Sequence, residues 1–127
     1  MEWEDLYRLI KHQKRKEIIE YLENGGDPNL LDKNGSTLIE AACMYGQHEI
    51  IKILVDHGGD INLKDNHGVT ALAVAAANGH HQSVELLLEL GAEINVQPHG
   101  WSLMEYVENC DCPSKKVRDL LLTRGAV

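Results

Sequence analysis

The sequence predicts an all-α repeat solenoid, because glycines recur at one spacing and short amphipathic segments lie between them. Three glycine series return every 32–34 residues: Gly35, Gly68 and Gly100; Gly46 and Gly79; Gly25, Gly58, Gly91 and Gly125. A fixed period of 20–50 residues is the mark of a repeat architecture. Each unit should therefore be one small structural element that buries its apolar face against its neighbours.

The most regular unit covers residues 65–95. It starts with a turn at 65–68, continues with a short Ala-rich segment and ends with a second apolar segment. In that second segment Val84, Leu87 and Leu88 have the i, i+3, i+4 spacing of one helix face. Two helices this short cannot cover both of their faces, so the unit needs neighbours on each side.

The motifs of this unit resemble the ankyrin repeat family, whose unit is a β-turn or hairpin followed by two antiparallel helices. Residues 65–72, DNHGVTAL, resemble the family's D-x-x-G-x-T-P-L opening. Residues 75–80, AAANGH, resemble A-A-x-x-G-H, and residues 84–95, VELLLELGAEIN, resemble V-x-L-L-L-x-x-G-A-D-V-N. The resemblance covers nearly the whole chain.

We expect a single domain over residues 1–127, with repeats at about 1–31, 32–64, 65–96 and 97–127. The first and last repeats depart from the pattern, as caps with one solvent-facing side should. Gln13 stands where later units carry Gly46 and Gly79. In the last unit two extra residues are expected in the helix–helix connection, at about 110–113.

The resemblance also assigns structural roles. Thr37, Thr70 and Ser102 should cap the first helix of their units, and Gly58 and Gly91 should end second helices in the left-handed conformation. Small residues should allow close helix approach, and three leucines should lie between the layers. These are Ala41, Ala42, Ala75 and Ala76, and Leu54, Leu87 and Leu121.

The family's T-P-L-H motif is altered in this chain. Leu38, Ala71 and Leu103 occupy the Pro position, and Glu40, Ala73 and Glu105 occupy the His position. Loss of the proline removes some pre-organisation of the first helical turn. Loss of the histidine removes a polar bridge between repeats, so we expect modest stability.

The charge of the chain is negative and uneven. Its formal net charge is -8, and residues 65–114 contain seven acidic residues and no Lys or Arg, whereas 11–16 is basic. Nucleic-acid binding depends on Lys and Arg, so it is disfavoured, and a basic protein partner is favoured. The simpler alternative is a solvated acidic face. The acidic start and the three cysteines without framework spacing favour the cytoplasm, and no membrane segment is expected.

No residues with catalytic spacing stand out, so we expect neither an enzyme nor a cofactor. Cys110 and Cys112, with His80, His81 or His99, could form a metal site, but C-x-C lacks a matching second pair. Cys43 takes the place of the second Ala of the family's A-A pair and should be buried.

Ankyrin proteins bind partners through their turn tips and the exposed ends of their first helices, which form a concave surface. This implies a set of partner-binding positions here: Lys33, Asn34, Ser36, Met44, Tyr45, Asn66, His67, Val69, Ala77, Asn78, His99 and Trp101. Met44, Tyr45 and Trp101 are large apolar residues of the types enriched at interfaces. Packing within the chain is the alternative for Tyr45 and Trp101.

We therefore expect a non-catalytic protein–protein interaction module that acts as an inhibitor or adaptor of a basic partner and is monomeric when free. A bacterial immunity protein that neutralises a toxin such as a nuclease is one alternative. The chain also resembles small four-repeat kinase inhibitors in size. A metal or enzymatic role for Cys110 and Cys112, and a homo-oligomer, are further alternatives.

Overall fold

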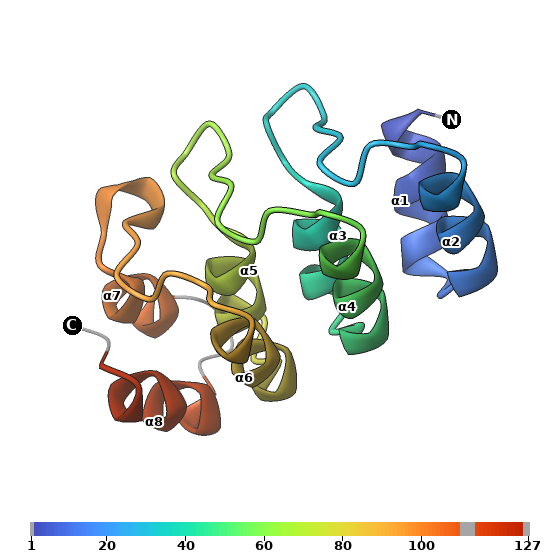
Figure 1. The fold of residues 1–127 in the computed structure, drawn as a ribbon. Helices are drawn as coiled ribbons and strands as arrows, with labels where there is room; N and C mark the ends of the chain where they lie inside the picture. The colour runs from blue at the N-terminus through green and yellow to red at the C-terminus, as the bar shows by residue number, and fades with distance from the viewer. Residues whose placement is uncertain (1, 110–113, 126–127) are drawn as a thin grey trace.

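The computed structural model describes residues 2–109 and 114–125 (Figure 1). Within these ranges eight α-helices form four successive pairs: α1 (Trp3–Lys11) and α2 (Arg15–Glu23), α3 (Leu38–Met44) and α4 (His48–Asp56), α5 (Ala71–Ala77) and α6 (His81–Glu89), and α7 (Leu103–Glu108) and α8 (Lys115–Thr123). A short 3₁₀ turn, η1 (Pro98–Gly100), precedes α7. The described residues contain no named strand, and the predicted all-α repeat solenoid is confirmed.

The helix pairs stack side by side in one direction. The first helices contact one another in the order α1, α3, α5 and α7, and the second helices in the order α2, α4, α6 and α8. Figure 1 shows the first and the last helix pairs at opposite ends of the stack, with loops projecting from one side of the helices. None of the helices in the described ranges is both long and apolar enough to cross a lipid bilayer.

The projecting loops are hairpins held by aspartates. Asp65 Oδ1 accepts hydrogen bonds from the backbone N–H groups of His67 and Val69, at 2.8 and 3.0 Å. Asp32 makes the same two bonds in the preceding loop. The Asn66 N–H donates to the Asn34 carbonyl at 3.1 Å, which joins neighbouring hairpins directly.

The fourth loop follows a different path, because Gln97 replaces the aspartate. The loop forms η1 and brings His99 to a φ of 54°, in the left-handed region. The His99 N–H still donates to the His67 carbonyl at 2.8 Å, so this loop stays attached to its neighbour.

The ends of the helices agree with the roles predicted from the sequence. The side chains of Thr37, Thr70 and Ser102 each accept a backbone N–H three residues later, as predicted. Gly58 and Gly91 both have a φ of 96°, which confirms their left-handed conformation. Gln13 has a φ of 56° where Gly46 has 64°, so a non-glycine residue adopts the left-handed turn of the first unit.

The core runs along the stack between the two helix layers. The four predicted alanines and the three predicted leucines are all buried, and the leucines are fully so. Truncation of such a leucine to Ala typically costs about 2–5 kcal/mol.

Asparagine side chains link the ends of successive second helices. Asn62 Oδ1 accepts the Glu93 N–H at 2.7 Å, and its Nδ2 donates to the Gly91 carbonyl at 3.4 Å. Asn29 makes the equivalent bonds to Asp60 and Gly58 one repeat earlier. Each asparagine therefore bridges its own repeat to the next.

Candidate protein-binding surface

The predicted binding residues lie on the hairpins and on the last turns of the first helices. Most of them are exposed: Lys33, Asn34, Met44, Asn66, His67, Asn78, His99 and Trp101. Ser36, Tyr45 and Ala77 are half-buried. These eleven residues can therefore all contribute at least part of their side chain to a contact.

Val69 is the exception, and its prediction as a contact residue is wrong. Its side chain is 5% exposed and belongs to the core. The cause is the hairpin itself: the Val69 N–H bonds the Asp65 carboxylate and its carbonyl accepts the Asp65 N–H at 2.9 Å. These bonds fold the return arm of the loop back onto the helices and turn the apolar side chain inward.

Four residues form what we call the N-terminal aromatic cluster: Trp3, Tyr7, Met44 and Tyr45. The Trp3 and Tyr7 rings stack with centroids 5.1 Å apart, and the Tyr7 and Tyr45 rings meet edge to face at 5.9 Å. The Tyr7 hydroxyl lies 2.5 Å from that of Tyr45 and 3.9 Å from Met44 Sδ. The hydrogen bond between Tyr7 and Tyr45, together with burial, raises the pKa of Tyr7. Tyr45 is thus tied into the fold, while Met44, 44% exposed, presents apolar surface.

A second group of rings lies over the last two hairpins. The His67 and His99 rings stack with centroids 5.0 Å apart, and Tyr106 stacks on His99 at 5.9 Å. Beside them Trp101 is 46% exposed, although it is the largest side chain in the fourth unit. His99, Trp101 and Tyr106 line an open depression of about 460 Å³.

Two members of these groups were missed in the sequence. Tyr7 follows Trp3 by four residues, the spacing at which side chains on one helix face meet. Tyr106 follows the His position of the motif, where the middle units carry the smaller Ala41 and Val74, so its ring reaches beyond those side chains. Both signals were present, but each needed the helix register of a divergent terminal repeat.

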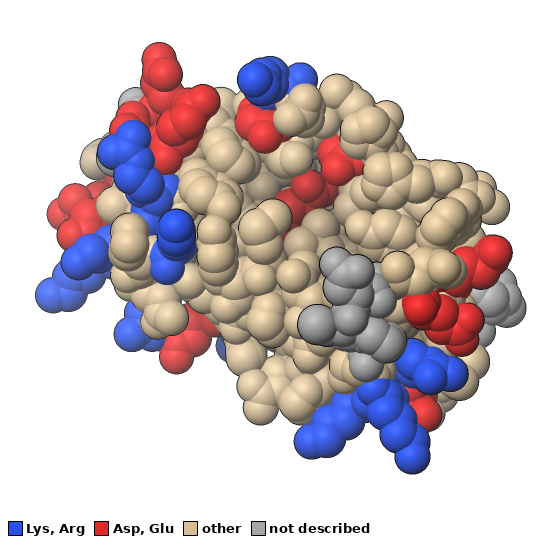
Figure 2. Space-filling model, turned by 180° about the vertical axis from the view of Figure 1, so that it is seen from behind, with Lys and Arg blue, Asp and Glu red and all other residues tan. Residues whose placement is uncertain are grey.

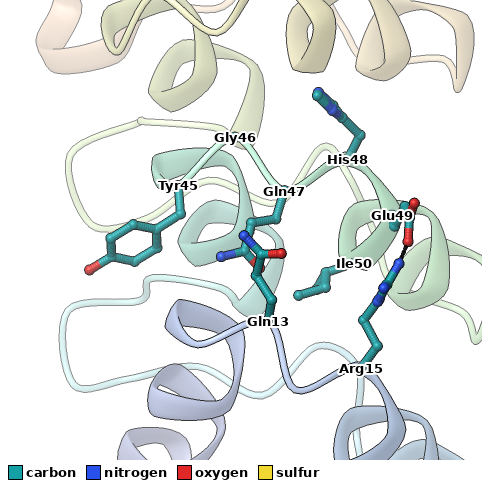
Figure 3. A pocket seen from close by; sticks show the side chains of 8 residues that line it. All are labelled: Gln13, Arg15, Tyr45, Gly46, Gln47, His48, Glu49 and Ile50. Carbon is teal, nitrogen blue, oxygen red and sulfur yellow. Dashed lines mark ion pairs between the residues drawn. The ribbon is translucent and has the colours of Figure 1, made fainter.

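Another cavity, of about 280 Å³, lies at the helix–helix elbow of the first two units (Figure 3). Figure 3 shows Gln13 and Tyr45 on one side and His48 on another, with the Arg15–Glu49 ion pair across its edge. Both charged side chains are more than half exposed, so the pair contributes about 0–1 kcal/mol at most. The lining carries no arrangement that suggests nucleophilic or acid–base catalysis.

Cys43 and His80 belong to residue types that often take part in catalysis or metal binding, but here each has a structural role. Burial raises the pKa of the Cys43 thiol, which is fully buried as predicted. His80 Nε2 lies 3.0 Å from the Met44 carbonyl and so links adjacent repeats. Among the described residues no group of three or more His, Cys, Asp or Glu is placed to hold a metal. Cys110 and Cys112, and the predicted two-residue insertion, lie outside the described residues.

Glu40 is an unusual member of this region. Its side chain is only 4% exposed, and burial with the nearby Asp65 carboxylate raises its pKa to about 8. Figure 2 shows a face whose middle is mostly uncharged, with a few acidic atoms recessed in it, while acidic and basic atoms both gather toward its ends.

Stacked helix pairs with hairpins on one side define a class, the helical repeat proteins that bind through an extended surface. Within that class a family model described as ankyrin repeats (3 copies) matches residues 6–98. The chain therefore belongs to the ankyrin repeat family, as its motifs predicted. An ankyrin repeat-containing protein of Schizosaccharomyces pombe is 46% identical over 39 residues, which are 31% of this chain and 19% of that protein.

Ankyrin repeats generally mediate protein–protein interaction, and the family is typically non-enzymatic. The aligned segment spans about a fifth of the yeast protein's length. That likeness therefore extends to about one repeat.

Proposed function

We propose that this chain is a non-catalytic binding module that binds one partner protein along its hairpins and first helices. The observation that carries the proposal is the exposure of Met44 and Trp101 at opposite ends of this surface. A fold of small, close-packed repeats has no structural need for such side chains outside its core. Met and Trp are both enriched at protein interfaces, and Trp is among the residues that dominate their energetics.

The partner we propose is basic. Residues 65–114 contain no Lys or Arg, and the hairpin aspartates Asp32 and Asp65 lie on the same side as the exposed apolar residues. By covering a basic surface the chain would act as an inhibitor or adaptor, and masking a toxin such as a nuclease is one such role. Complementary charge would mainly accelerate association and reject wrong partners.

A photo-crosslinking experiment tests this surface. A benzophenone amino acid is placed at position 44 or 101 and, as a matched control, at Leu122, an apolar residue of α8 that is 55% exposed. Positions 44 and 101 should yield the same crosslinked partner in the native source, whereas position 122 should not. Equal crosslinking from all three positions would contradict the proposed surface.

The partner identified in this way allows the energetic test. Met44→Ala and Trp101→Ala should each weaken binding by more than tenfold, while Leu122→Ala should change it little. Affinity should also fall as salt rises from about 0.05 to 0.5 M, since exposed charges are then screened. Salt-independent binding would exclude a basic partner.

The free chain is proposed to be a monomer. Sedimentation velocity at micromolar concentration should give one species of about 14 kDa. A dimer that dissociates on Trp101→Ala would instead assign the exposed apolar residues to self-association.

A further inference from the structure

A small cavity opens beside the N-terminal aromatic cluster, between α1, the first hairpin and α3. It encloses about 150 Å³. The rings of Trp3 and Tyr7 and the side chain of Met44 form its apolar sides, and Glu40 and Asp32 contribute carboxyl groups. Val74 of α5 also lines it. The cavity therefore draws on three successive repeats of the proposed binding surface.

Glu40 leaves one polar atom unused in this cavity. The carboxyl is hydrogen-bonded by the Thr37 backbone and the Ser36 side chain. Its Oε1 atom is nevertheless buried and has no hydrogen-bond partner among the described residues. A buried acceptor without a partner destabilises the structure, because its lost hydration is not replaced. An occupant that donates to this atom would remove that destabilisation.

Trp3, another residue that lines the cavity, also has an unused polar atom. The Nε1–H donor of Trp3 is also buried without a partner in the described part of the chain. A complete occupant would thus offer a donor to Glu40 and an acceptor, such as a peptide carbonyl, to Trp3. A peptide segment with a donor at the tip of its side chain provides both.

The carboxyl groups around Glu40 favour a positively charged donor. Asp32 and Asp65, from the two neighbouring hairpins, lie close enough to Glu40 to raise its pKa further, and none of the described residues lining the cavity is Lys or Arg. At neutral pH the carboxyl is therefore largely protonated in the free protein. A cation placed beside it would be attracted by three carboxyl groups and would restore its ionised form.

The walls also favour a cation. A Lys or Arg cation within about 6 Å of an aromatic ring centroid is stabilised by the ring, more strongly so when it is desolvated. Trp3 and Tyr7, whose ring centroids lie 5.1 Å apart, both line the cavity, so a cation inside it would lie near an aromatic ring. Aliphatic carbons of a lysine or arginine stem would pack against Met44 and Val74.

We propose that this cavity receives one lysine or arginine side chain of the partner protein, with its cation paired to Glu40 and flanked by Trp3 and Tyr7. The inference rests on the proposed function, because it names the group through which a basic partner is recognised. It also gives a reason for a glutamate at the position where the family motif has histidine.

Binding should then release a proton. The cation pairs with ionised Glu40. Below a pH of about 8, each decrease of one pH unit should therefore lower the affinity by up to about tenfold. The other groups near Glu40 are Asp32 and Asp65 on the hairpins, Tyr7 on α1 and Cys43 on α3. The pKa values of Tyr7 and Cys43 are both raised, so these two stay neutral between pH 6 and 8.

The test uses short peptides as probes and needs no partner. Acetyl-Gly-Lys-Gly-amide and its Arg counterpart are titrated into the ¹⁵N-labelled full chain, with norleucine and glutamine peptides as uncharged controls. The cationic peptides should shift the Trp3 indole N–H resonance saturably, and more tightly at pH 8 than at pH 6. Trp101 provides an internal reference outside the cavity.

The variants Glu40→Gln and Glu105→Gln complete the design. Glu105 occupies the same motif position in the fourth unit, but it is exposed and caps α7. Glu40→Gln should weaken binding of the cationic peptides more than tenfold and abolish its pH dependence, while Glu105→Gln should bind as the parent does. Spectra of both variants establish that they are folded.

Three results would overturn the inference: no saturable shift up to 50 mM peptide, equal shifts with the norleucine peptide, or unchanged binding in Glu40→Gln. The first would mean that the cavity takes up no such side chain, the second that no cation is needed, and the third that Glu40 does not pair with the cation. The crosslinking experiment at positions 44 and 101 would still decide the proposed function. Conversely, if the cationic peptides bind but positions 44 and 101 crosslink no protein, the cavity site would be supported and the proposed protein-binding function would not.

Discussion

The phenol oxygens of Tyr7 and Tyr45 lie 2.5 Å apart, and their hydrogen bond joins the first unit to the second across the exposed side of the stack. Tyr45 directly follows α3, and Tyr7 lies in the middle of α1. Among the described residues, backbone bonds between hairpins join the second unit to the third and the third to the fourth. The tyrosine pair joins the first unit to the second through side chains.

This link makes Tyr45 a determinant of stability. Tyr45→Phe should lower the free energy of unfolding by about 0.5–1.5 kcal/mol, because one partly buried hydrogen bond is lost. Tyr7→Phe should have a similar effect, and the double variant should lose less than the sum of the two, since both remove the same bond. Urea unfolding followed by circular dichroism measures all three. Additive losses would show that the hydroxyl groups act independently.

Asn62 should be equally sensitive to substitution. Asn62→Ala removes an acceptor for the Glu93 N–H and a donor to the Gly91 carbonyl, and should cost about 1–3 kcal/mol. Asn62→Asp keeps the shorter bond and should cost less. Asn78→Ala is the control, because that amide donates within its own helix to the Val74 carbonyl. If Asn78→Ala lowers the free energy of unfolding as much as Asn62→Ala does, the bridge between repeats is not what makes Asn62 important for stability.

The sequence predicted the fold well because the repeat rests on local, recurring demands. Capping by Thr37 and a left-handed Gly58 are each set by a few neighbouring residues, and the period places them in register. Burial at the hairpin was harder to read. Val69 follows a turn glycine and looks like part of a tip, and the structure was needed to show that its bonds to the Asp65 carboxylate and backbone N–H accompany an inward-facing side chain.

The candidate site was predicted only in part, because its chemistry depends on contacts between repeats. Met44 and Trp101 were found from residue type and position, and both are exposed. Glu40 was recognised as a departure from the family motif, yet its burial and raised pKa arise from Trp3, Tyr7 and the two hairpin aspartates. Such a pocket has no signature within a single repeat.

Gln13 stores a small strain that a single substitution can remove. A left-handed conformation costs a non-glycine residue roughly 1–2 kcal/mol, and the φ of Gln13 is 56°. Gln13→Gly should relieve this, less the greater entropy of glycine in the unfolded chain, for a net gain of up to about 1 kcal/mol.

The reverse change at the matching position gives the comparison. Gly46→Ala should destabilise, since its φ is 64° and a Cβ atom would lie 2.9 Å from the His80 ring. Thermal or urea unfolding should show that Gln13→Gly is more stable than the parent protein and that Gly46→Ala is less stable. A destabilised Gln13→Gly would mean that the glutamine side chain itself contributes to the first elbow.

The buried Glu40 carboxyl should make folding depend on pH. In the unfolded chain it has an ordinary pKa of about 4.5, and in the folded chain the pKa is raised to about 8. Between these values the folded state holds a proton that the unfolded state has lost. The free energy of unfolding therefore falls as pH rises from about 4.5 to 8, and is constant with respect to this group outside that window.

Glu40→Gln removes the titration while keeping the shape of the side chain. Relative to the parent, this variant should become progressively more stable as pH rises through the window, and the difference should level off above about pH 8. Urea midpoints measured at half-unit steps from pH 4 to 9 provide the curve. Glu105→Gln, at the exposed carboxyl of the same motif position, is measured alongside for comparison. Parallel curves for Glu40→Gln and the parent would show that water reaches the carboxyl and that the cavity is not a low-dielectric site.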